Sequence, residues 1–492
     1  MEFAGMLGAK LCDLEEKKDF FQDFNLDVCI TKINSLVKGY DVQAMYMGVP
    51  KDLKTIHYRR HITEDLLEPS LREAFAEYAK AIERAKKQEK QSKYNNHQPQ
   101  EEKWHADAMY TYAVAVESLY DVLLSYENLS AELQSLVAHL QQYISSEKYI
   151  KWREVVQDVV ETFQKETVYF SIQKNKLIFE ESGEYEEFGK RMIRAFHITE
   201  KDKGKTREVR ELSRMERVMA ERIVKWHGLD KKLKMLMSIS MEETLLQVAT
   251  DVQYYLGFYY FVDYMKEKGY TFCLPKDGKE MKICGGYDAA MVVKSEKPVI
   301  RNDFTMEEEE KFFVITGANG GGKTTFARMI GQILYFCRMG LLVPCDEAVI
   351  PYFTDILSHF SNEETEASGR GKLVEELTRL QPMMQEQNEN CFVILNELFT
   401  TAATLDAGIM GQKVLTHFMN MNCRGIYVTH IQSLAEKREG VVSMVAELES
   451  DHHTRSFKIT RKPAKEGEYE DSLITKYNMT YEQMKVVMEN EN

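Results

Sequence analysis

The spacing of apolar residues divides the chain into a helical part and a mixed part. Over residues 70–90 and 107–145 apolar side chains recur every three or four positions, as at Tyr110, Val114 and Leu119. This spacing is typical of amphipathic helices. Glycine is sparse before residue 265, and Leu, Ala, Glu and Lys dominate, so we predict that residues 1–265 are almost entirely helical.

Two segments interrupt this helical pattern. Residues 86–104 are polar and contain one proline, which predicts an exposed loop between two helices. The segment Glu166–Glu180 alternates between apolar and polar residues around a central Lys174-Asn175 pair. Such alternation across a turn-forming pair predicts a small β-hairpin.

From residue 270 onward the pattern changes. Glycines become frequent, and short apolar runs at 312–316, 391–395 and 425–429 alternate with helical stretches. Alternating strands and helices predict a mainly parallel sheet, with ligand-binding groups at the carboxyl ends of the strands. The expected fold class is therefore α + α/β: a helical region followed by a parallel-sheet domain.

Composition and charge narrow the class of protein. The 492 residues carry a formal net charge of −14, which argues against a general nucleic-acid-coating protein but allows a local basic site. The eight cysteines form no C-x-x-C pair, so we expect neither a zinc knuckle nor a disulfide framework. The start of the chain lacks a long apolar signal region, and the most apolar stretch, 252–264, is too short to cross a bilayer. We therefore expect a cytoplasmic protein with no membrane partner.

The strongest chemical signal is a glycine-rich segment after the first apolar run. Gly317-x-x-x-x-Gly322-Lys323-Thr324 has the spacing of a phosphate-binding P-loop. In such a loop the glycines let backbone N–H groups face an anion, and the lysine reaches the β- and γ-phosphates. Thr324 would place its hydroxyl on Mg²⁺. The predicted ligand is ATP with Mg²⁺, and the predicted contacts are Gly317, Ala318, Asn319, Gly320, Gly321, Gly322, Lys323, Thr324 and Thr325.

Polar residues follow the two later apolar runs. Asn396 and Glu397 end the run that starts at 391, and His430 ends the run that starts at 425. We predict that Glu397 orients the attacking water and that Asn396 binds Mg²⁺ through a water. His430 would donate a hydrogen bond to the γ-phosphate. Asp406 could cross a dimer interface to contact a second site. The alternatives are an ordinary strand end for Asn396-Glu397, a packed histidine for His430, and a helix N-cap for Asp406.

A basic segment lies at residues 201–234, which contain twelve Lys or Arg residues and six Asp or Glu residues. Four arginines fall on one face of a helix, opposite an apolar face. Such a row can follow a phosphate backbone. The alternative is a solvated face with ion pairs to Glu208, Glu211 and Glu221. The predicted nucleic-acid contacts are Arg207, Arg210, Arg214 and Arg217.

Taken in order, these segments resemble the MutS family of DNA mismatch-repair-type ATPases. Thr316–Thr325 is similar to the family's T-G-P-N-x-G-G-K-S-T, and Pro298–Asn302 resembles its nucleotide-contacting segment, which adds Ile300 and Asn302 to the predicted site. Further segments resemble the family in the right order: Ile56–Arg59, Ile283–Asp288, Val343–Cys345, Glu366–Arg370 and Thr404–Gly408.

The resemblance implies a domain order and an activity. Residues 1–145 would form a helical core domain, 146–265 lever helices with a reduced clamp, and 266–492 an ABC-like P-loop ATPase domain with a C-terminal helical tail. It also implies a homodimer that closes on double-stranded or branched DNA under control of ATP, in mismatch repair or recombination. We expect a short form, without the N-terminal mismatch-recognition and connector domains and without a C-terminal nuclease domain.

Three positions depart from the family pattern. Asn396 replaces the usual aspartate, Val299 stands where an aromatic ring stacks on adenine, and Gly371 stands where a serine would reach the partner's γ-phosphate. These changes predict slow hydrolysis more than they weaken the prediction of binding. The alternative function is an ATP-binding switch that acts on RNA or the ribosome with vestigial hydrolysis. A transporter subunit is disfavoured because no L-S-G-G-Q segment precedes residue 391.

Overall fold

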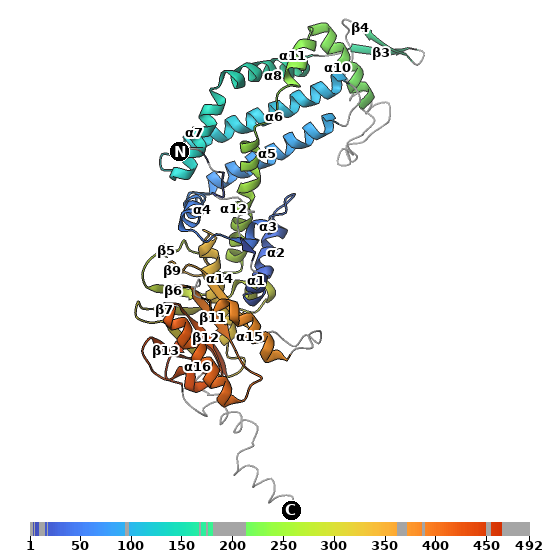
Figure 1. Cartoon of the computed structure of the whole chain (residues 1–492). Coiled ribbons are helices and arrows are strands. Elements are labelled where there is room, and N and C mark those ends of the chain that lie inside the picture. The colour runs from blue at the N-terminus through green and yellow to red at the C-terminus, as the bar shows by residue number, and fades with distance from the viewer. Residues whose placement is uncertain are drawn as a thin grey trace, which may run out of the picture. The chain divides into compact units, whose positions relative to one another are not determined.

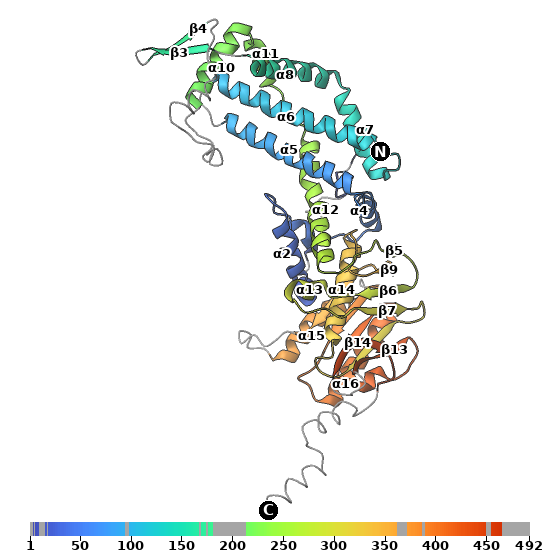
Figure 2. The same cartoon turned by 180° about the vertical axis from the view of Figure 1, so that it is seen from behind.

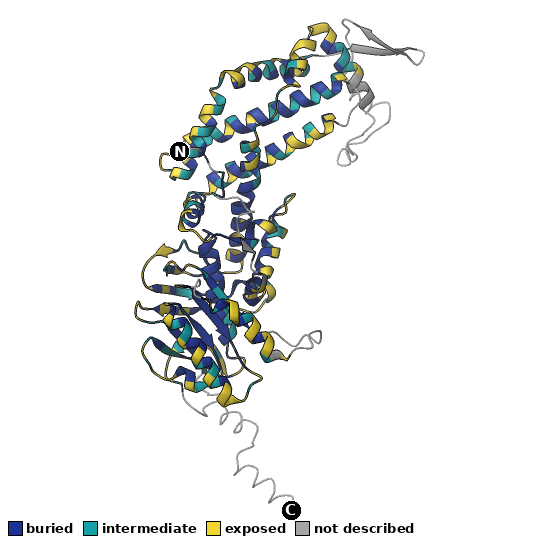
Figure 3. Cartoon of the chain, viewed as in Figure 1, coloured by how far each residue is buried: buried dark blue, intermediate teal, exposed yellow. Residues whose placement is uncertain are grey.

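The computed structural model describes most of the chain and divides it into two units. The described residues are 3, 5–8, 15–16, 18–93, 98–166, 169–173, 176–180, 213–361, 371–385, 389–448 and 454–464. Unit 1 comprises Met1–Phe3 and Glu68–Val252, and unit 2 comprises Ala4–Leu67 and Gln253–Asn492. Both units have buried apolar interiors (Figure 3).

Unit 1 consists of helices and one hairpin (Figures 1 and 2). Its two longest helices, α5 and α6, lie side by side and bury one apolar face each, with Phe75 and Leu119 among the buried side chains. The Tyr78 hydroxyl donates to the carbonyl of Leu245 over 2.8 Å and ties α5 to α12. The elements are α5 (Pro69–Lys93), α6 (Gln98–Leu124), α7 (Ala131–Ile144), α8 (Glu147–Lys165), β3 (Tyr169–Gln173), β4 (Lys176–Glu180), α10 (Ser213–His227), α11 (Asp230–Leu236) and the first part of α12 (Glu243–Glu267).

Two local predictions for this unit have different outcomes. The predicted hairpin is confirmed, because β3 and β4 pair antiparallel. The predicted loop at 86–104 is wrong, because α5 runs to Lys93 and α6 begins at Gln98. Most polar residues of that segment are Lys, Gln or Glu, which are good helix formers. Its proline, Pro99, lies in the first turn of α6, where a missing N–H breaks no helical hydrogen bond.

Unit 2 is built around a six-stranded sheet with the order β10-β11-β12-β8-β13-β14. The three strands predicted from the sequence, β8, β11 and β12, are parallel neighbours, which confirms a mainly parallel sheet. β10 and β13 are also parallel to their neighbours, and β14 pairs antiparallel with β13. The strands are β8 (Phe312–Gly317), β10 (Ile356–Phe360), β11 (Phe392–Asn396), β12 (Arg424–Val428), β13 (Val441–Leu448) and β14 (Arg455–Arg461).

A smaller sheet and several helices complete this unit. The smaller sheet has the order β5-β9-β6-β7, and a two-stranded pair joins β1 and β2. These strands are β1 (Glu15–Glu16), β2 (Gly48–Val49), β5 (Lys276–Asp277), β6 (Met281–Gly286), β7 (Asn302–Met306) and β9 (Glu347–Ile350). The helices are α1 (Lys18–Asp23), α2 (Leu26–Leu36), α3 (Gln43–Met47), α4 (Leu53–Asp65), α13 (Ala289–Lys294), α14 (Lys323–Arg338), α15 (Lys372–Met383), α16 (Thr404–Asn420) and the short η5 (Gln432–Ala435).

The first helices of the chain pack in unit 2, and several of their hydrogen bonds are to α14. Gln332 donates to the carbonyl of Phe24 over 2.9 Å, and Tyr335 donates to that of Tyr46 over 2.7 Å. Arg338 donates to the carbonyl of Pro50 over 2.8 Å. These contacts place α1–α4 in a different unit from α5–α7, although the sequence assigned residues 1–145 to one domain. The three-domain division itself stays a prediction.

The apolar stretch at 252–264 lies within α12. Tyr254 donates through its hydroxyl to the carbonyl of Met339 over 2.7 Å, and the rings of Phe258 and Phe336 lie 5.4 Å apart. Its apolar side chains therefore pack against α14 and the turn that follows it. Within the part of the chain that the structure describes, no helix has the length and apolarity to cross a membrane.

Candidate nucleotide-binding site

The glycine-rich segment forms the turn between β8 and α14. Gly317, Gly320 and Gly322 have φ angles of 112°, 69° and 92°, in the left-handed region that favours glycine. Gly322 is the N-cap of α14, a helix of 16 residues. The loop therefore ends at the positive end of a helix, where an anion is stabilised.

Lys323 lies inside this loop. Its side chain is only 4% exposed, and its ammonium donates to the carbonyls of Gly317 over 2.7 Å and Ala318 over 3.0 Å. Burial lowers the pKa of Lys323, and Glu397 acts in the opposite direction. An ammonium held against the loop is in place to meet a phosphate oxygen bound there.

Thr324 connects the loop to the end of β11. Its hydroxyl donates to the side-chain oxygen of Asn396 over 3.1 Å. A hydroxyl, an amide oxygen and the nearby carboxylate of Glu397 are oxygen ligands, which suit Mg²⁺. Among the described residues no group of three or more His, Cys, Asp or Glu side chains could hold a metal. This donor set fits an ion bound by few protein ligands together with phosphates, as Mg²⁺ usually is.

Glu397 and His430 lie against each other at the carboxyl ends of β11 and β12. Nε2 of His430 is 3.0 Å from Oε1 of Glu397. Glu397 has a left-handed φ of 55°, and its N–H donates to the carbonyl of Val428 over 2.9 Å. Since β11, β12 and β8 are adjacent and parallel, the structure brings Lys323, Glu397 and His430 to one edge of the sheet.

The side chain of Asn302 forms hydrogen bonds with the neighbouring strand β14. Its side-chain amide donates to the carbonyl of Phe457 over 3.1 Å, and its oxygen accepts from the N–H of Ile459 over 2.9 Å. Both polar groups of Asn302 therefore brace β14. Ile300 is 40% exposed, and the N–H of Val299 is bonded to the hydroxyl of Tyr270 over 2.7 Å.

The structure adds two residues of β14 that the sequence did not indicate. A guanidinium nitrogen of Arg455 lies 2.7 Å from the point where a Cβ on Gly320 would be. Phe457 is 44% exposed, and its Cβ lies 3.5 Å from the corresponding point on Gly322. A basic and an aromatic residue two positions apart were visible in the sequence, but no motif linked them to the loop. Only the pairing of β14 with β13 brings them there.

Comparisons with known proteins agree with this arrangement. The family model described as MutS domain V matches residues 313–485. The DNA mismatch repair protein MutS of Pseudothermotoga lettingae is 28% identical over 153 residues, which cover 30% of this chain and 19% of that protein. The protein of the same name from Thermotoga petrophila is 26% identical over 206 residues, or 42% of this chain and 25% of that protein.

Residues 313–485 are therefore similar to MutS domain V. The matched segments span a quarter or less of these MutS relatives. The region that matches domain V contains β11, β12, the glycine-rich loop and all but the first residue of β8.

Other predicted MutS-type segments fall partly outside the described residues. Arg207 and Arg210 lie outside them, and so does Glu366–Arg370. Arg214 and Arg217 belong to α10, which confirms a helix there, but their side chains are outside the described part. Asp406 lies in the first turn of α16, whose N-cap is Ala403, so the N-cap alternative for Asp406 is wrong.

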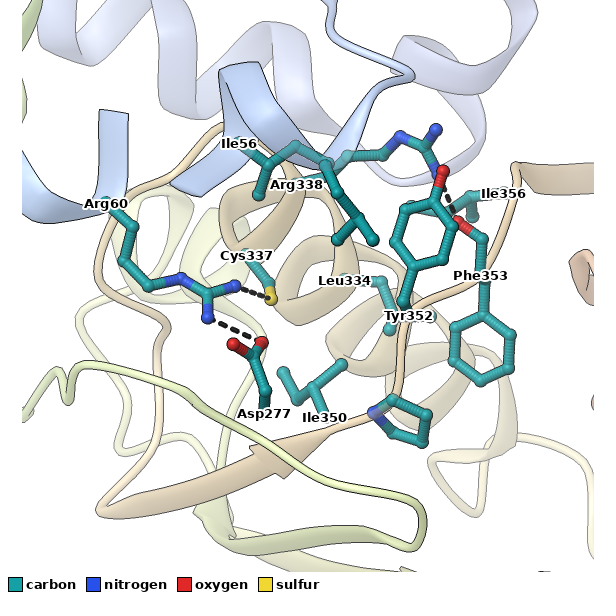
Figure 4. A pocket seen from close by; sticks show the side chains of 12 residues that line it. Ile56, Arg60, Asp277, Leu334, Cys337, Arg338, Ile350, Tyr352, Phe353 and Ile356 are labelled. Atoms are coloured by element: carbon teal, nitrogen blue, oxygen red, sulfur yellow. Dashed lines mark hydrogen bonds and ion pairs between the residues drawn. The ribbon is translucent and has the colours of Figure 1, made fainter. Parts of the chain in front are cut away.

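A small cavity elsewhere in unit 2 does not compete with this site (Figure 4). It has a volume of about 40 Å³, which suits one or two waters and is far too small for a nucleotide. Arg60 donates to Asp277 over 2.6 Å at its wall, and Cys337 lies beside them. The cavity therefore belongs to the packing of α4 against α14.

A buried histidine near the end of β10 should make the stability of unit 2 depend on pH. His359 is 1% exposed, and its Nε2 donates to the carbonyl of Glu376 over 3.1 Å. Burial, aided by the charge of Arg379, lowers the pKa of His359 to about 4. The folded protein therefore keeps this imidazole neutral at a pH where the unfolded chain protonates it.

We expect His359→Gln to reduce the loss of stability on acidification. The unfolded histidine binds a proton below about pH 6.5 while the folded one stays neutral, so stability falls as pH drops from 6.5 toward 4. Between pH 7 and pH 5 this group should cost the wild type about 2 kcal/mol. Urea unfolding of both proteins at the two pH values gives the change in unfolding free energy with pH for each. Other titrating groups such as Asp23 contribute equally to both proteins, so their effect cancels in the comparison. Parallel pH dependences would contradict the assignment.

Proposed function

We propose that the protein is a MutS-like, ATP-dependent DNA-binding protein. In this proposal ATP binding and slow hydrolysis control a dimeric clamp on DNA, in mismatch repair or a recombination-type process. The observation that carries it is the meeting of Lys323, Thr324–Asn396 and Glu397–His430 at one sheet edge in a chain with a MutS domain V.

The proposed roles follow from the contacts. The phosphates of ATP would lie in the loop formed by residues 317–325, with the Lys323 ammonium on the β- and γ-phosphates. Thr324 and, through a water, Asn396 would hold Mg²⁺, which neutralises phosphate charge. Glu397 would accept a proton from the attacking water or orient it, and His430 would hold that carboxylate in place. Because Asn396 is uncharged, hydrolysis should be slow.

A homodimer is part of the proposal. Leu405 and Ile409, one turn apart near the start of α16, are 76% and 50% exposed. Exposed apolar side chains close together on a helix are typical of an interaction surface. They follow β11 closely in the chain, so a second copy seated there would lie near the nucleotide site.

DNA is proposed as the partner because both curated relatives are DNA mismatch repair proteins. The net charge of −14 repels phosphate overall, so a local basic surface must supply the contacts. The arginine row at 207–217 is the best candidate in the sequence.

The proposal is tested by measuring the affinity of the full chain for branched DNA, duplex DNA and structured RNA over a salt series, with and without Mg²⁺-ATP. We expect DNA to bind, with an affinity that depends on ATP. The Lys323→Ala variant should lose the dependence on ATP. Binding to RNA alone, or DNA affinity that ignores ATP in the wild type, would contradict the proposal.

Replacing the four arginines, Arg207, Arg210, Arg214 and Arg217, with glutamine should weaken binding to duplex DNA and flatten its salt dependence. Each lost phosphate contact lowers the log–log salt slope by about 0.9, so the slope should fall by roughly two to four units. ATP binding and preference among DNA sequences should not change, since phosphate contacts do not read bases.

The matched control replaces four exposed lysines of α5 with glutamine: Lys80, Lys87, Lys90 and Lys93. This change removes the same charge from another helix of unit 1. If both quadruple variants lower the slope equally, net charge and not the arginine row carries the binding. An unchanged slope in the arginine variant would support the solvated-face interpretation.

A further inference from the structure

Glu376 on α15 is a buried acidic residue that has no role in the proposed function. It is only 5% exposed. Its Oε2 accepts a hydrogen bond from the N–H of Phe399 over 3.0 Å. Phe399 is two residues after Glu397, so this bond ties α15 directly to the turn that presents the proposed catalytic carboxylate.

The backbone of that turn has an uncommon conformation. Glu397 and Phe399 have φ angles of 55° and 62°, in the left-handed region that residues other than glycine rarely adopt. Such conformations persist when surrounding contacts determine them. The position of the Glu397 side chain therefore depends on the contacts that hold the turn.

Those contacts lie on both sides of Glu397. On the strand side, its own N–H donates to Val428 over 2.9 Å. Beyond Glu397, the N–H of Phe399 donates to Glu376 over 3.0 Å. The turn is thus held by β12 at one end and by α15 at the other.

Glu376 is itself held in place. Its backbone carbonyl accepts from Nε2 of His359 over 3.1 Å. One turn further along α15, Arg379 donates to the carbonyl of Phe360 over 3.0 Å and forms an ion pair with Asp23 of α1. The helix that carries Glu376 is therefore fixed to β10 and α1, which gives the carboxylate a defined place.

Helix stability alone does not explain a glutamate here. The neighbours of Glu376 on the inner face of α15 are apolar, as at Leu373 and Leu380, and both pack on the core beside β11. Burying a carboxylate is unfavourable unless hydrogen bonds compensate for the lost water. The Phe399 N–H supplies one such hydrogen bond to Oε2, so the residue matches the turn and not the apolar interior.

We infer that Glu376 is a positioning residue for the proposed hydrolysis: its carboxylate fixes the Leu398–Phe399 peptide and thereby sets the direction of the Glu397 side chain. The inference rests on the proposed function, because Glu376 can affect hydrolysis through Glu397 only if Glu397 acts on the attacking water.

Three variants of the full chain test this role. Glu376→Leu removes the acceptor and keeps similar bulk. Glu376→Gln keeps a side-chain oxygen that can accept from the same N–H while removing the charge. Glu375→Leu is the matched control, because Glu375 is the preceding residue of the same helix but is exposed. For each protein we would measure the Mg²⁺-ATP dissociation constant, the single-turnover hydrolysis rate and hydrogen exchange at the amide of Phe399.

Glu376→Leu should slow hydrolysis by roughly 10- to 100-fold, because misplacing a catalytic group by about 1 Å has an effect of this size. The ATP dissociation constant should stay within about twofold, since the loop at 317–325 is untouched. Exchange at Phe399 should accelerate by roughly tenfold or more, because its hydrogen bond is lost. Glu376→Gln and Glu375→Leu should resemble the wild type in all three measurements.

Different outcomes overturn different claims. If the wild type hydrolyses ATP and Glu376→Leu does so equally fast, the inference is wrong and the proposed function stands. A Glu376→Leu protein that loses ATP binding as much as hydrolysis would also overturn it, since that result indicates a general structural role. A wild type that binds ATP but does not hydrolyse it would remove hydrolysis from the proposed function and the inference with it.

Discussion

Lys323→Ala should greatly weaken nucleotide binding while leaving the fold intact. The ammonium of Lys323 lies inside the glycine-rich loop, bonded to the carbonyls of Gly317 and Ala318. In the proposed complex it would exchange these carbonyls for phosphate oxygens, and a charge-assisted contact of that kind contributes up to about 3 kcal/mol. Removing it should weaken ATP binding by on the order of 100-fold. Calorimetric titration with Mg²⁺-ATP measures the change.

Lys437→Ala is the control for this experiment. Lys437 is an exposed lysine of the same unit, so its removal changes the net charge equally without entering the loop. Circular dichroism should be the same for both variants and the wild type. An ATP affinity that is unchanged in Lys323→Ala would refute the assignment of the loop.

Glu397→Gln should bind ATP normally and trap it. The amide retains the shape of the side chain but cannot take a proton from water. Loss of a general base typically slows a reaction by roughly 10²- to 10⁴-fold. His430, now 3.0 Å from the carboxylate, should keep a hydrogen bond to the amide oxygen, so the turn should hold its place. Single-turnover hydrolysis with radiolabelled ATP measures the rate separately from binding.

Asn396→Asp provides the comparison in the opposite direction. An aspartate would add a negative charge beside the hydroxyl of Thr324, where Mg²⁺ is proposed to bind. We expect tighter Mg²⁺-ATP binding and faster turnover than in the wild type. If the wild type turns over quickly and Glu397→Gln makes no difference, Glu397 is not the catalytic base.

The sheet and the centre of the candidate site could be predicted because both follow from local patterns. The apolar runs before Asn396 and His430 are long enough to be buried strands, and parallel strands place their carboxyl ends on one edge. That rule alone predicted that Lys323, Glu397 and His430 would meet. The prediction of a loop at 86–104 is wrong because a polar composition does not by itself indicate irregular structure. Lys, Gln and Glu are polar but favour helix.

What could not be predicted depends on long-range pairing. Arg455 and Phe457 approach the loop only because β14 pairs with β13 beside β8. Glu376 follows another glutamate, and the sequence does not say which of the two is buried or that it reaches Phe399. The bonds of the Asn302 side chain to β14 had no signal in the sequence, and its predicted role at the nucleotide stays a prediction. Contacts of this kind are set by the fold as a whole and have no fixed spacing along the chain.

The central claim is that nucleotide and DNA binding are coupled, and one measurement tests it most directly. The full chain is titrated with a non-hydrolysable ATP analogue and Mg²⁺ in a calorimeter, with and without saturating branched DNA. Each titration gives the dissociation constant of the analogue. Coupling between two sites is reciprocal, so DNA should change the affinity for the analogue by roughly fivefold or more. The same dissociation constant with and without bound DNA would contradict the account, because ATP could not then control a clamp.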